Sequence, residues 1–151
     1  PGHGSRGRRV DQQAQISILD THVWLWLMEG DPGIGAEVIG ALEHAASVGL
    51  LYVTSLSLWE IAMLERAGRV RFTVPVETWL EEALATPGLN LMQIDAQVAA
   101  ESVRLPGEFP GDPVDALLVA AARTHSGMLY TADPALASYA STGAIRVQPV
   151  G

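Results

Sequence analysis

The sequence has 151 residues, of which 48% are apolar, and this length and composition suit a single folded domain. It contains no cysteine, which excludes disulfides, thiol catalysis and thiolate zinc sites, and no lysine, which excludes Schiff-base enzymes and P-loop NTPases. The net charge of −8 makes the chain a poor general binder of nucleic acid, so a nucleic-acid role would need local positive groups or bound cations.

Residues 1–15 show no periodicity and few apolar side chains, so we predict a flexible arm or an expression remnant there and a folded domain over residues 16–151. No apolar run reaches the roughly 18 residues that a membrane-spanning helix needs. No apolar segment near the start has the pattern of a signal peptide. These features predict a cytoplasmic protein with no membrane partner.

In chain order, the first half alternates short apolar runs with helical patterns. Residues 16–19 are typical of a buried strand, and Asp20 ends the run. The elements predicted up to this midpoint are strands at 16–19 and 50–53 and helices at 22–27, 36–47, 58–67 and 76–85. Ser55 or Ser57 is expected to cap the helix at 58–67, and Gly68 to end it.

The second half continues the alternation. Its predicted elements are strands at 89–94, 128–131 and 145–147 and helices at 96–104, 114–125 and 133–141. Strands that alternate with helices, without hairpin signals, indicate a single α/β domain with three layers, α/β/α, around a mainly parallel central sheet. In such sheets a functional site lies beyond the carboxyl ends of the strands, near a switch in strand order.

Two acidic residues follow directly on predicted strands. Asp20 comes after the first strand and Asp133 just after the fourth, so both belong at the carboxyl edge of the predicted sheet. Helix capping is the competing explanation. For Asp133 taken alone capping is the better one, because Asp133 precedes Pro134 as an N-cap precedes proline at the first helical position. For Asp20 the two explanations are equally good.

Glu60 interrupts an apolar stripe on the helix predicted at 58–67. Its neighbours three and four positions away are Leu56, Met63 and Leu64. A buried, isolated carboxylate is costly, and it either takes up a proton or finds a cation. The alternative is that the edge of this stripe is solvated.

Asp115 repeats this pattern near the start of the helix predicted at 114–125, where apolar residues lie three and four positions on. Asp112 has a simpler role, because Pro113 at the first helical position makes Asp112 the N-cap. Asp115 then stands at the third position, where Glu or Gln more often closes a capping box. We therefore assign capping to Asp112 and metal binding to Asp115.

Together the four acids predict a metal site formed by Asp20, Glu60, Asp115 and Asp133. Carboxylates gathered in one place repel one another, so such a cluster needs a divalent cation. Oxygen ligands favour Mg²⁺ or Mn²⁺ over zinc or copper. A cation with open water positions suits hydrolysis of a phosphodiester, because it lowers the pKa of a bound water and offsets charge on the phosphate oxygens.

Four short motifs occur in a fixed order, LDTHV at 19–23, SLWEI at 57–61, GDPVD at 111–115 and LYTAD at 129–133. In this order they resemble the PIN domain and, more narrowly, the VapC-type toxins of bacterial toxin–antitoxin modules. The resemblance covers about residues 16–147. It implies an endoribonuclease that depends on Mg²⁺ or Mn²⁺ and whose catalytic residues are the four acids named above.

The resemblance also implies partners. These are a homodimer, a cognate antitoxin that covers and inhibits the site, and a structured RNA substrate such as a tRNA or rRNA loop. Asp112 matches a further acid of the subgroup and Thr131 a hydroxyl near the site, so both are expected to support the metal ligands. Arg66, Arg69 and Arg71 are candidates for contact with RNA phosphates, although solvated surface charge or antitoxin contact explains them as well.

One alternative remains open, a PIN fold without catalysis that acts only as an RNA- or protein-binding module. Its acids would then serve as helix caps. The presence of all four acids favours the nuclease. A haloacid-dehalogenase-like phosphatase is excluded, because it needs a lysine and a second Asp where this chain has His22.

Overall fold

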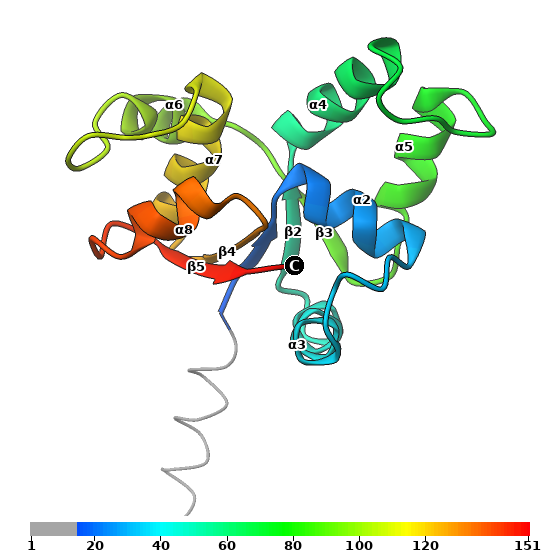
Figure 1. The fold of residues 1–151 in the computed structure, drawn as a ribbon, viewed down its shortest axis with the longest axis horizontal. Coiled ribbons are helices and arrows are strands. Elements are labelled where there is room, and N and C mark those ends of the chain that lie inside the picture. The colour runs from blue at the N-terminus through cyan, green and yellow to red at the C-terminus, as the bar shows by residue number, and fades with distance from the viewer. Residues whose placement is uncertain (1–14) are drawn as a thin grey trace, which may run out of the picture.

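A computed structural model describes residues 15–151 of the chain (Figure 1). The prediction of a flexible arm at residues 1–15 therefore concerns residues that, except for Gln15, lie outside the described ones. The strands are β1 (Ser17–Leu19), β2 (Leu51–Thr54), β3 (Leu89–Met92), β4 (Met128–Thr131) and β5 (Arg146–Pro149). The helices are α2 (Thr21–Glu29), α3 (Ala36–Ser47), α4 (Ser55–Arg66), α5 (Val76–Leu84), α6 (Ala96–Ser102), α7 (Pro113–Thr124) and α8 (Pro134–Ala140). None of the helices within this part of the chain is long and apolar enough to cross a membrane.

The five strands form one sheet in the order β3-β2-β1-β4-β5, and every pairing is parallel. The chain builds outward from β1 to β2 and β3, and then crosses back to place β4 on the other side of β1. The order therefore reverses between β1 and β4, where Leu19 lies opposite Tyr130 and the Asp20 N–H donates to the Tyr130 carbonyl at 2.9 Å. This topology confirms the predicted fold and places the switch point beside Asp20.

The sheet separates two apolar cores, because successive strand residues point to opposite faces. Leu19 and Tyr130 belong to the core shared with α2, α3, α4 and α5, whereas Ile18 and Leu129 belong to the core shared with α6, α7 and α8. All four side chains are buried. In Figure 1 the two groups of helices lie on opposite sides of the strands, which gives the three layers predicted from the sequence.

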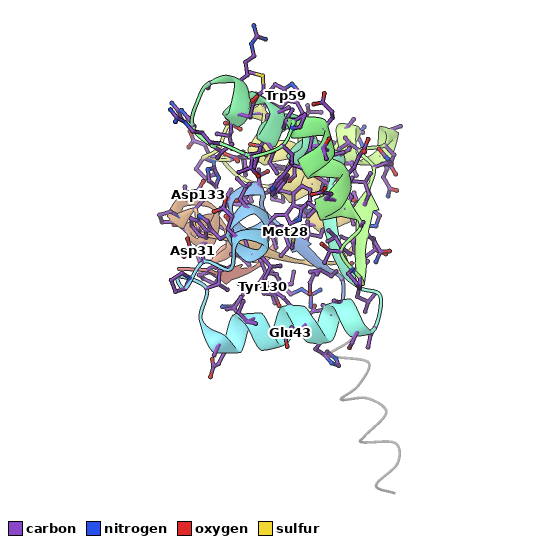
Figure 2. All side chains as sticks on the ribbon, turned by 90° about the vertical axis from the view of Figure 1, so that its right-hand side faces the viewer. Met28, Asp31, Glu43, Trp59, Tyr130 and Asp133 are labelled. Atoms are coloured by element: carbon purple, nitrogen blue, oxygen red, sulfur yellow. The ribbon has the colours of Figure 1, made fainter. Side chains whose placement is uncertain are left out.

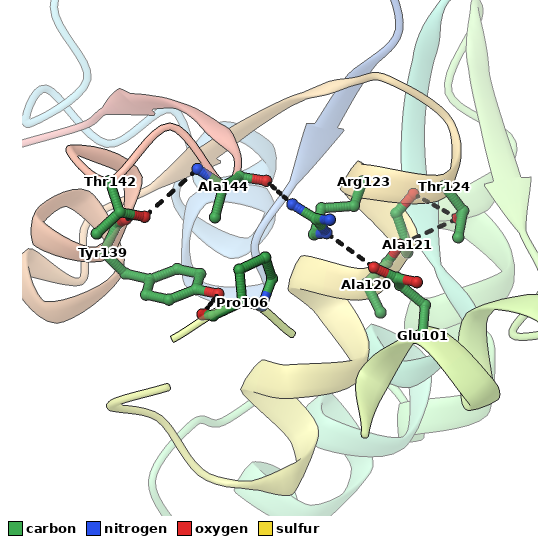
Figure 3. A network of polar contacts seen from close by, with 9 residues as sticks. All are labelled: Glu101, Pro106, Ala120, Ala121, Arg123, Thr124, Tyr139, Thr142 and Ala144. Atoms are coloured by element: carbon green, nitrogen blue, oxygen red, sulfur yellow. Dashed lines mark hydrogen bonds and ion pairs between the residues drawn. The ribbon is translucent and has the colours of Figure 1, made fainter. Parts of the chain in front are cut away.

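A polar network holds the loop that leads into α7 (Figure 3). Arg123 of α7 donates from Nε to Glu101 Oε1 of α6 at 2.9 Å, and from Nη1 to the Ala144 carbonyl. The Tyr139 hydroxyl of α8 donates to the Pro106 carbonyl in that loop at 2.6 Å. These bonds tie the last turn of α7 to α6 and to the segment after α8, and they tie α8 to the loop that leads into α7.

The capping predicted for α4 is wrong. The helix begins at Ser55, three residues earlier than expected, and its N-cap position is Thr54, whose side chain makes no capping bond. The Ser55 hydroxyl instead accepts from the Ile94 N–H at 3.3 Å, and Ser57 contacts the hydroxyl of Thr21. Both serines fail as caps because they lie inside the helix and other segments use their hydroxyls. The helix ends at Arg66, one residue before the predicted end, and Gly68 follows at φ +74°.

The two edge strands differ most from the prediction. The strand expected at 89–94 ends at Met92, and the last strand runs over Arg146–Pro149 rather than 145–147. Both strands lie at the edges of the sheet, where a single neighbour determines how far the pairing extends.

Candidate active site

The four predicted acids come from four elements that meet at the carboxyl edge of the sheet. Asp20 follows β1, Asp133 follows β4, Glu60 lies in the helix after β2, and Asp115 lies in the first turn of α7. All four side chains are half-buried. They also affect one another, because Asp20 and Asp133 raise the pKa of Asp115, and Asp20 and Asp115 raise the pKa of Glu60. The fold therefore makes neighbours of acids that are far apart in the sequence.

Asp20 is held from both sides at the switch point. Its Oδ1 accepts from the Thr21 N–H at 2.7 Å, as the N-cap of α2, and its Oδ2 accepts from the Thr131 hydroxyl at 2.6 Å. Thr131 is buried, with 1% of its surface exposed, and its hydroxyl also accepts from the Asp133 N–H at 3.1 Å. Asp20 is thus a helix cap at the carboxyl edge of the sheet, and Thr131 links it to the segment that carries Asp133.

Asp133 caps α8, as its position before Pro134 predicts. Its Oδ1 accepts from the Ala135 N–H at 2.9 Å. Oδ2 accepts from no donor among residues 15–151. Capping and ligand binding are therefore compatible, because they use different oxygens of one carboxylate.

Glu60 is bonded to α2 through a pair of buried hydroxyls. Its Oε1 accepts from the Thr21 hydroxyl at 2.6 Å, and that hydroxyl lies 2.8 Å from the Ser57 hydroxyl. Burial raises the pKa of Glu60, and Asp20 and Asp115 raise it further, whereas the Thr21 bond and the His22 charge lower it. Glu60 is half-buried, so the solvated-edge alternative describes only part of its surroundings.

Asp115 closes a capping box, which the sequence analysis did not assign to it. The Asp115 N–H donates to Asp112 Oδ1 at 2.8 Å, and Asp115 Oδ2 accepts from the Asp112 N–H at 3.3 Å. The capping role of Asp112 is thus confirmed, and Asp115 is not left without a structural role. The capping bond does not offset the surrounding charge, because burial, Asp112, Asp20 and Asp133 raise the pKa of Asp115 to about 6.

Gly111 leaves the space that the Asp115 carboxylate occupies. A Cβ at this position would lie 2.8 Å from Asp115 Cβ, 2.9 Å from Asp115 Oδ2 and 2.7 Å from a ring carbon of Phe109. We therefore expect Gly111→Ala to displace Asp115 and to weaken Mn²⁺ binding by about 10-fold, as other changes that misplace metal ligands do. Calorimetric titration with Mn²⁺ checks this, with Gly40→Ala in α3 as the control, since nothing lies within 4 Å of a Cβ there. Parental affinity in Gly111→Ala would contradict it.

The donor set fits a hard divalent cation, although the side chains do not converge on one point. The groups that shift the pKa values of Glu60 and Asp115 are carboxylates, apart from the Thr21 hydroxyl, the Asp112 backbone N–H and the His22 side chain. Carboxylate oxygens without an Arg or Lys partner are ligands for Mg²⁺ or Mn²⁺. However, no three His, Asp or Glu side chains within residues 15–151 are arranged to hold a metal ion together. Each carboxylate is instead bonded to donors of the protein.

The three candidate arginines lie away from the acids. Arg66 is in the last turn of α4, about 9 Å along the helix axis from Glu60 at 1.5 Å per residue, and Arg69 and Arg71 follow in the connector. All three are exposed, and none forms an ion pair within the described part of the chain. Trp59 lies on the same helix with 54% of its surface exposed, at the opposite end of the molecule from Glu43 of α3 (Figure 2).

Sequence reasoning missed two site residues, Thr21 and Ser57. Thr21 was noted only as part of the LDTHV motif, and Ser57 was expected to be a helix cap. Their contact joins positions 36 residues apart, and no local pattern signals it. The order of the strands, which makes α2 and α4 neighbours, was also not available from the sequence.

Comparison with known proteins gives a consistent picture. The PIN domain profile matches residues 17–141. The chain is 34% identical over 122 residues to Ribonuclease VapC22 of Mycobacterium tuberculosis (strain ATCC 25618 / H37Rv), covering 81% of this chain and 90% of that protein.

Two solved structures share the fold. The first is VapBC2 from Rickettsia felis bound to a DNA fragment from its promoter, with a TM-score of 0.66, 15% identity and coverage of 90% of this chain and 99% of that one. The second is a toxin–antitoxin complex from Klebsiella pneumoniae, with a TM-score of 0.53, 22% identity and coverage of 78% and 86%. At these identities the likeness concerns the fold alone.

Proposed function

This chain belongs to the PIN-domain family, and we propose that it is a VapC-type endoribonuclease that hydrolyses RNA phosphodiester bonds. One observation carries the proposal: four carboxylates from four elements gather at the switch point of the sheet, and the pKa values of Glu60 and Asp115 are raised there. The similarity to Ribonuclease VapC22 supports the choice of RNA as substrate.

We propose that Mg²⁺ or Mn²⁺ is held by Asp20, Glu60, Asp115 and Asp133. When bound, such a cation lowers the pKa of a water ligand and offsets charge on the phosphate oxygens. The protein's part is to present the ligands: Thr131 holds Asp20 by a hydrogen bond of 2.6 Å, and Asp112 fixes the helix start that aims Asp115. The negative charge that surrounds Asp115 favours binding of a cation over binding of a bare phosphate.

One observation favours a second function, that of an RNA- or protein-binding module without catalysis. The acids within residues 15–151 do not form a ready group of three metal ligands. Asp20, Asp112 and Asp133 are moreover all helix caps, which such a module would need for folding alone.

A cleavage assay separates the two functions. The proposed nuclease cuts a mixture of structured RNAs in the presence of Mn²⁺ or Mg²⁺ and stops when EDTA removes the metal. Cleavage that continues in EDTA would contradict the metal dependence. Binding of the same RNAs without any cleavage would favour the binding module.

Metal affinity should depend on pH through Asp115. Its pKa is raised to about 6 from the ordinary 3.8, so it keeps its proton up to a higher pH than a solvated aspartate does. A protonated carboxyl is a poor ligand, so Mn²⁺ affinity should rise as pH increases through about 6 and level off above 7. Mn²⁺ titrations from pH 5 to 8 check this. An affinity that does not change across this range would contradict the role of Asp115.

The three arginines are proposed to bind RNA phosphates. Replacing Arg66, Arg69 and Arg71 together by Gln should raise the KM for RNA about 10-fold or more, with little change in kcat, since these residues lie away from the acids. In single-stranded RNA, each phosphate contact contributes roughly 0.7 to the slope of log affinity against log salt concentration. Loss of three contacts should therefore reduce the magnitude of this slope by about 2. Arg104→Gln, another exposed arginine, is the control. An unchanged slope would contradict RNA contact.

We also propose a homodimer and a cognate antitoxin. The toxin–antitoxin complex among the structural neighbours supports the antitoxin. Trp59 and Met63, one helical turn apart on α4 with 54% and 44% of their surfaces exposed, offer an apolar surface for a protein partner. Light scattering should give twice the chain mass of 16.0 kDa, and co-expression with the product of an adjacent small DNA-binding protein gene should suppress cleavage. A monomer would contradict the proposed homodimer. Cleavage that this product leaves unchanged would contradict the proposed antitoxin.

A further inference from the structure

Thr21 is bonded to two of the four acids at once. Its backbone N–H donates to Asp20 Oδ1 at 2.7 Å, and its hydroxyl donates to Glu60 Oε1 at 2.6 Å. Thr21 is also the first residue of α2 and is 1% exposed, so its position is fixed by the helix and by packing. One residue therefore spans the gap between the carboxylate that follows β1 and the carboxylate of α4.

The direction of the hydrogen bond between Thr21 and Ser57 follows from the number of hydrogens on the Thr21 hydroxyl. A threonine hydroxyl has one hydrogen, and Thr21 gives it to Glu60, because an ionised carboxylate only accepts. The Thr21 hydroxyl must therefore accept from Ser57 across the 2.8 Å contact. Ser57 is 1% exposed and lies one turn before Glu60 on α4. The Ser57 hydroxyl of α4 thus donates to the Thr21 hydroxyl of α2, which in turn donates to Glu60 of α4.

We propose that Thr21, supported by Ser57, is a positioning residue that sets the spacing and orientation of the Asp20 and Glu60 carboxylates for metal binding. This inference rests on the proposed function. Two like charges that are not held would turn away from each other, and the bonds from Thr21 oppose that movement. Because Thr21 uses only Glu60 Oε1, the other oxygen of Glu60 accepts no bond from the described residues and is available to a cation.

The network differs from ordinary core packing, and Thr54 provides the comparison. Thr54 is fully buried at the end of β2, and its hydroxyl has no hydrogen-bond partner among the described residues. Thr21 and Thr54 are thus two buried threonines at the same edge of the sheet, of which only Thr21 is bonded to an acid. Valine has nearly the shape of threonine but lacks the hydroxyl, so Thr21→Val removes the hydrogen bonds of that hydroxyl, whereas Thr54→Val removes a hydroxyl that has none.

The test measures Mn²⁺ affinity of the full chain by calorimetry at pH 7.5, together with kcat, KM and the midpoint of thermal unfolding. Thr21→Val should bind Mn²⁺ about 10-fold or more weakly, as loss of a group that orients a metal ligand does, and should lower kcat while leaving the KM for RNA unchanged. Thr21→Ser keeps the hydroxyl and should restore affinity to within about threefold of the parent. Thr54→Val should bind as the parent does.

The other possible outcomes also support or overturn the positioning role of Thr21. Parental Mn²⁺ affinity in Thr21→Val overturns the inference, and an equal loss in Thr21→Ser and Thr21→Val overturns it too, because the methyl packing would then matter rather than the hydroxyl. If Thr21→Val does not fold, Ser57→Ala decides: a loss of about threefold or more supports the inference, and parental affinity overturns it. A parent protein that binds no Mn²⁺ contradicts the proposed function itself, whereas unchanged variants of a parent that binds contradict only this inference.

Discussion

Asp115→Asn is expected to lower RNA cleavage at least about 100-fold and, at the same time, to stabilise the metal-free protein. Activity falls because an amide is a much weaker ligand than a carboxylate for a hard cation. The metal-free protein becomes more stable because burial and neighbouring acids raise the pKa of Asp115 to about 6 in the folded state. Above this pH, burial and charge repulsion therefore make the ionised Asp115 unfavourable for folding. The uncharged Asn removes this effect, and its side-chain oxygen can still accept the Asp112 N–H of the capping box.

The size of the stability effect depends on pH. The folded pKa lies above the ordinary 3.8, so the wild-type loses stability as pH rises from about 4 to about 6. In EDTA at pH 7.5 the variant should be more stable by roughly 1 kcal/mol after solvent screening, or about 2–4 °C in unfolding midpoint, and this advantage should vanish near pH 4. Asp95→Asn, which changes the N-cap of α6, is the control and should show neither effect. A destabilised, fully active Asp115→Asn would contradict both assignments.

Asp20→Asn is expected to remove Mn²⁺ binding and to lower cleavage at least about 100-fold. Asp20 is the one acid that raises the pKa values of both Glu60 and Asp115 within the described residues. Its removal should therefore lower both pKa values in the metal-free protein, which carboxyl-carbon NMR titration can follow. The fold should survive, because the Asn oxygen can accept the Thr21 N–H while the Thr131 hydroxyl rotates to accept from the amide.

Asp31→Asn is the matched control for this variant. Asp31 is also half-buried and accepts a backbone N–H, that of Gly33 at 2.7 Å, but it affects neither pKa. It should therefore leave Mn²⁺ affinity and both titrations unchanged. If Asp20→Asn did not change the pKa of Asp115, the claim that the charge of Asp20 acts on Asp115 would be wrong.

Local patterns were enough to predict most of the fold. The strand at β4 was predicted with its observed bounds, because Met128 to Thr131 is a short apolar run between turn signals. The start of α7 was predicted within one residue because Asp112 and Pro113 carry a capping signal that depends on adjacent residues alone. The sequence did not predict the strand order, since the pairing of β1 with β4 joins distant segments.

The positions of the site residues could also be predicted only where local patterns determine them. Asp20 and Asp133 could be placed at one edge because each follows a strand, and parallel strands end at a common edge. The Thr21–Ser57 contact could not be predicted, because it requires α2 and α4 to be neighbours. The capping bond of Asp115 was discounted from residue preference, as Glu or Gln is commoner there, although the shorter side chain also reaches the Asp112 N–H.

Direct Mn²⁺ binding tests the central claim, that the four carboxylates hold a divalent cation together. The measurement is an electron paramagnetic resonance titration of free Mn²⁺ at pH 7.5, on the parent protein and on Asp20→Asn, with and without a non-cleavable RNA that supplies a phosphate ligand. We expect saturable binding to the parent, tighter with RNA, and none to Asp20→Asn. A parent that binds no Mn²⁺ even with RNA present, or an Asp20→Asn variant that binds as the parent does, would contradict it.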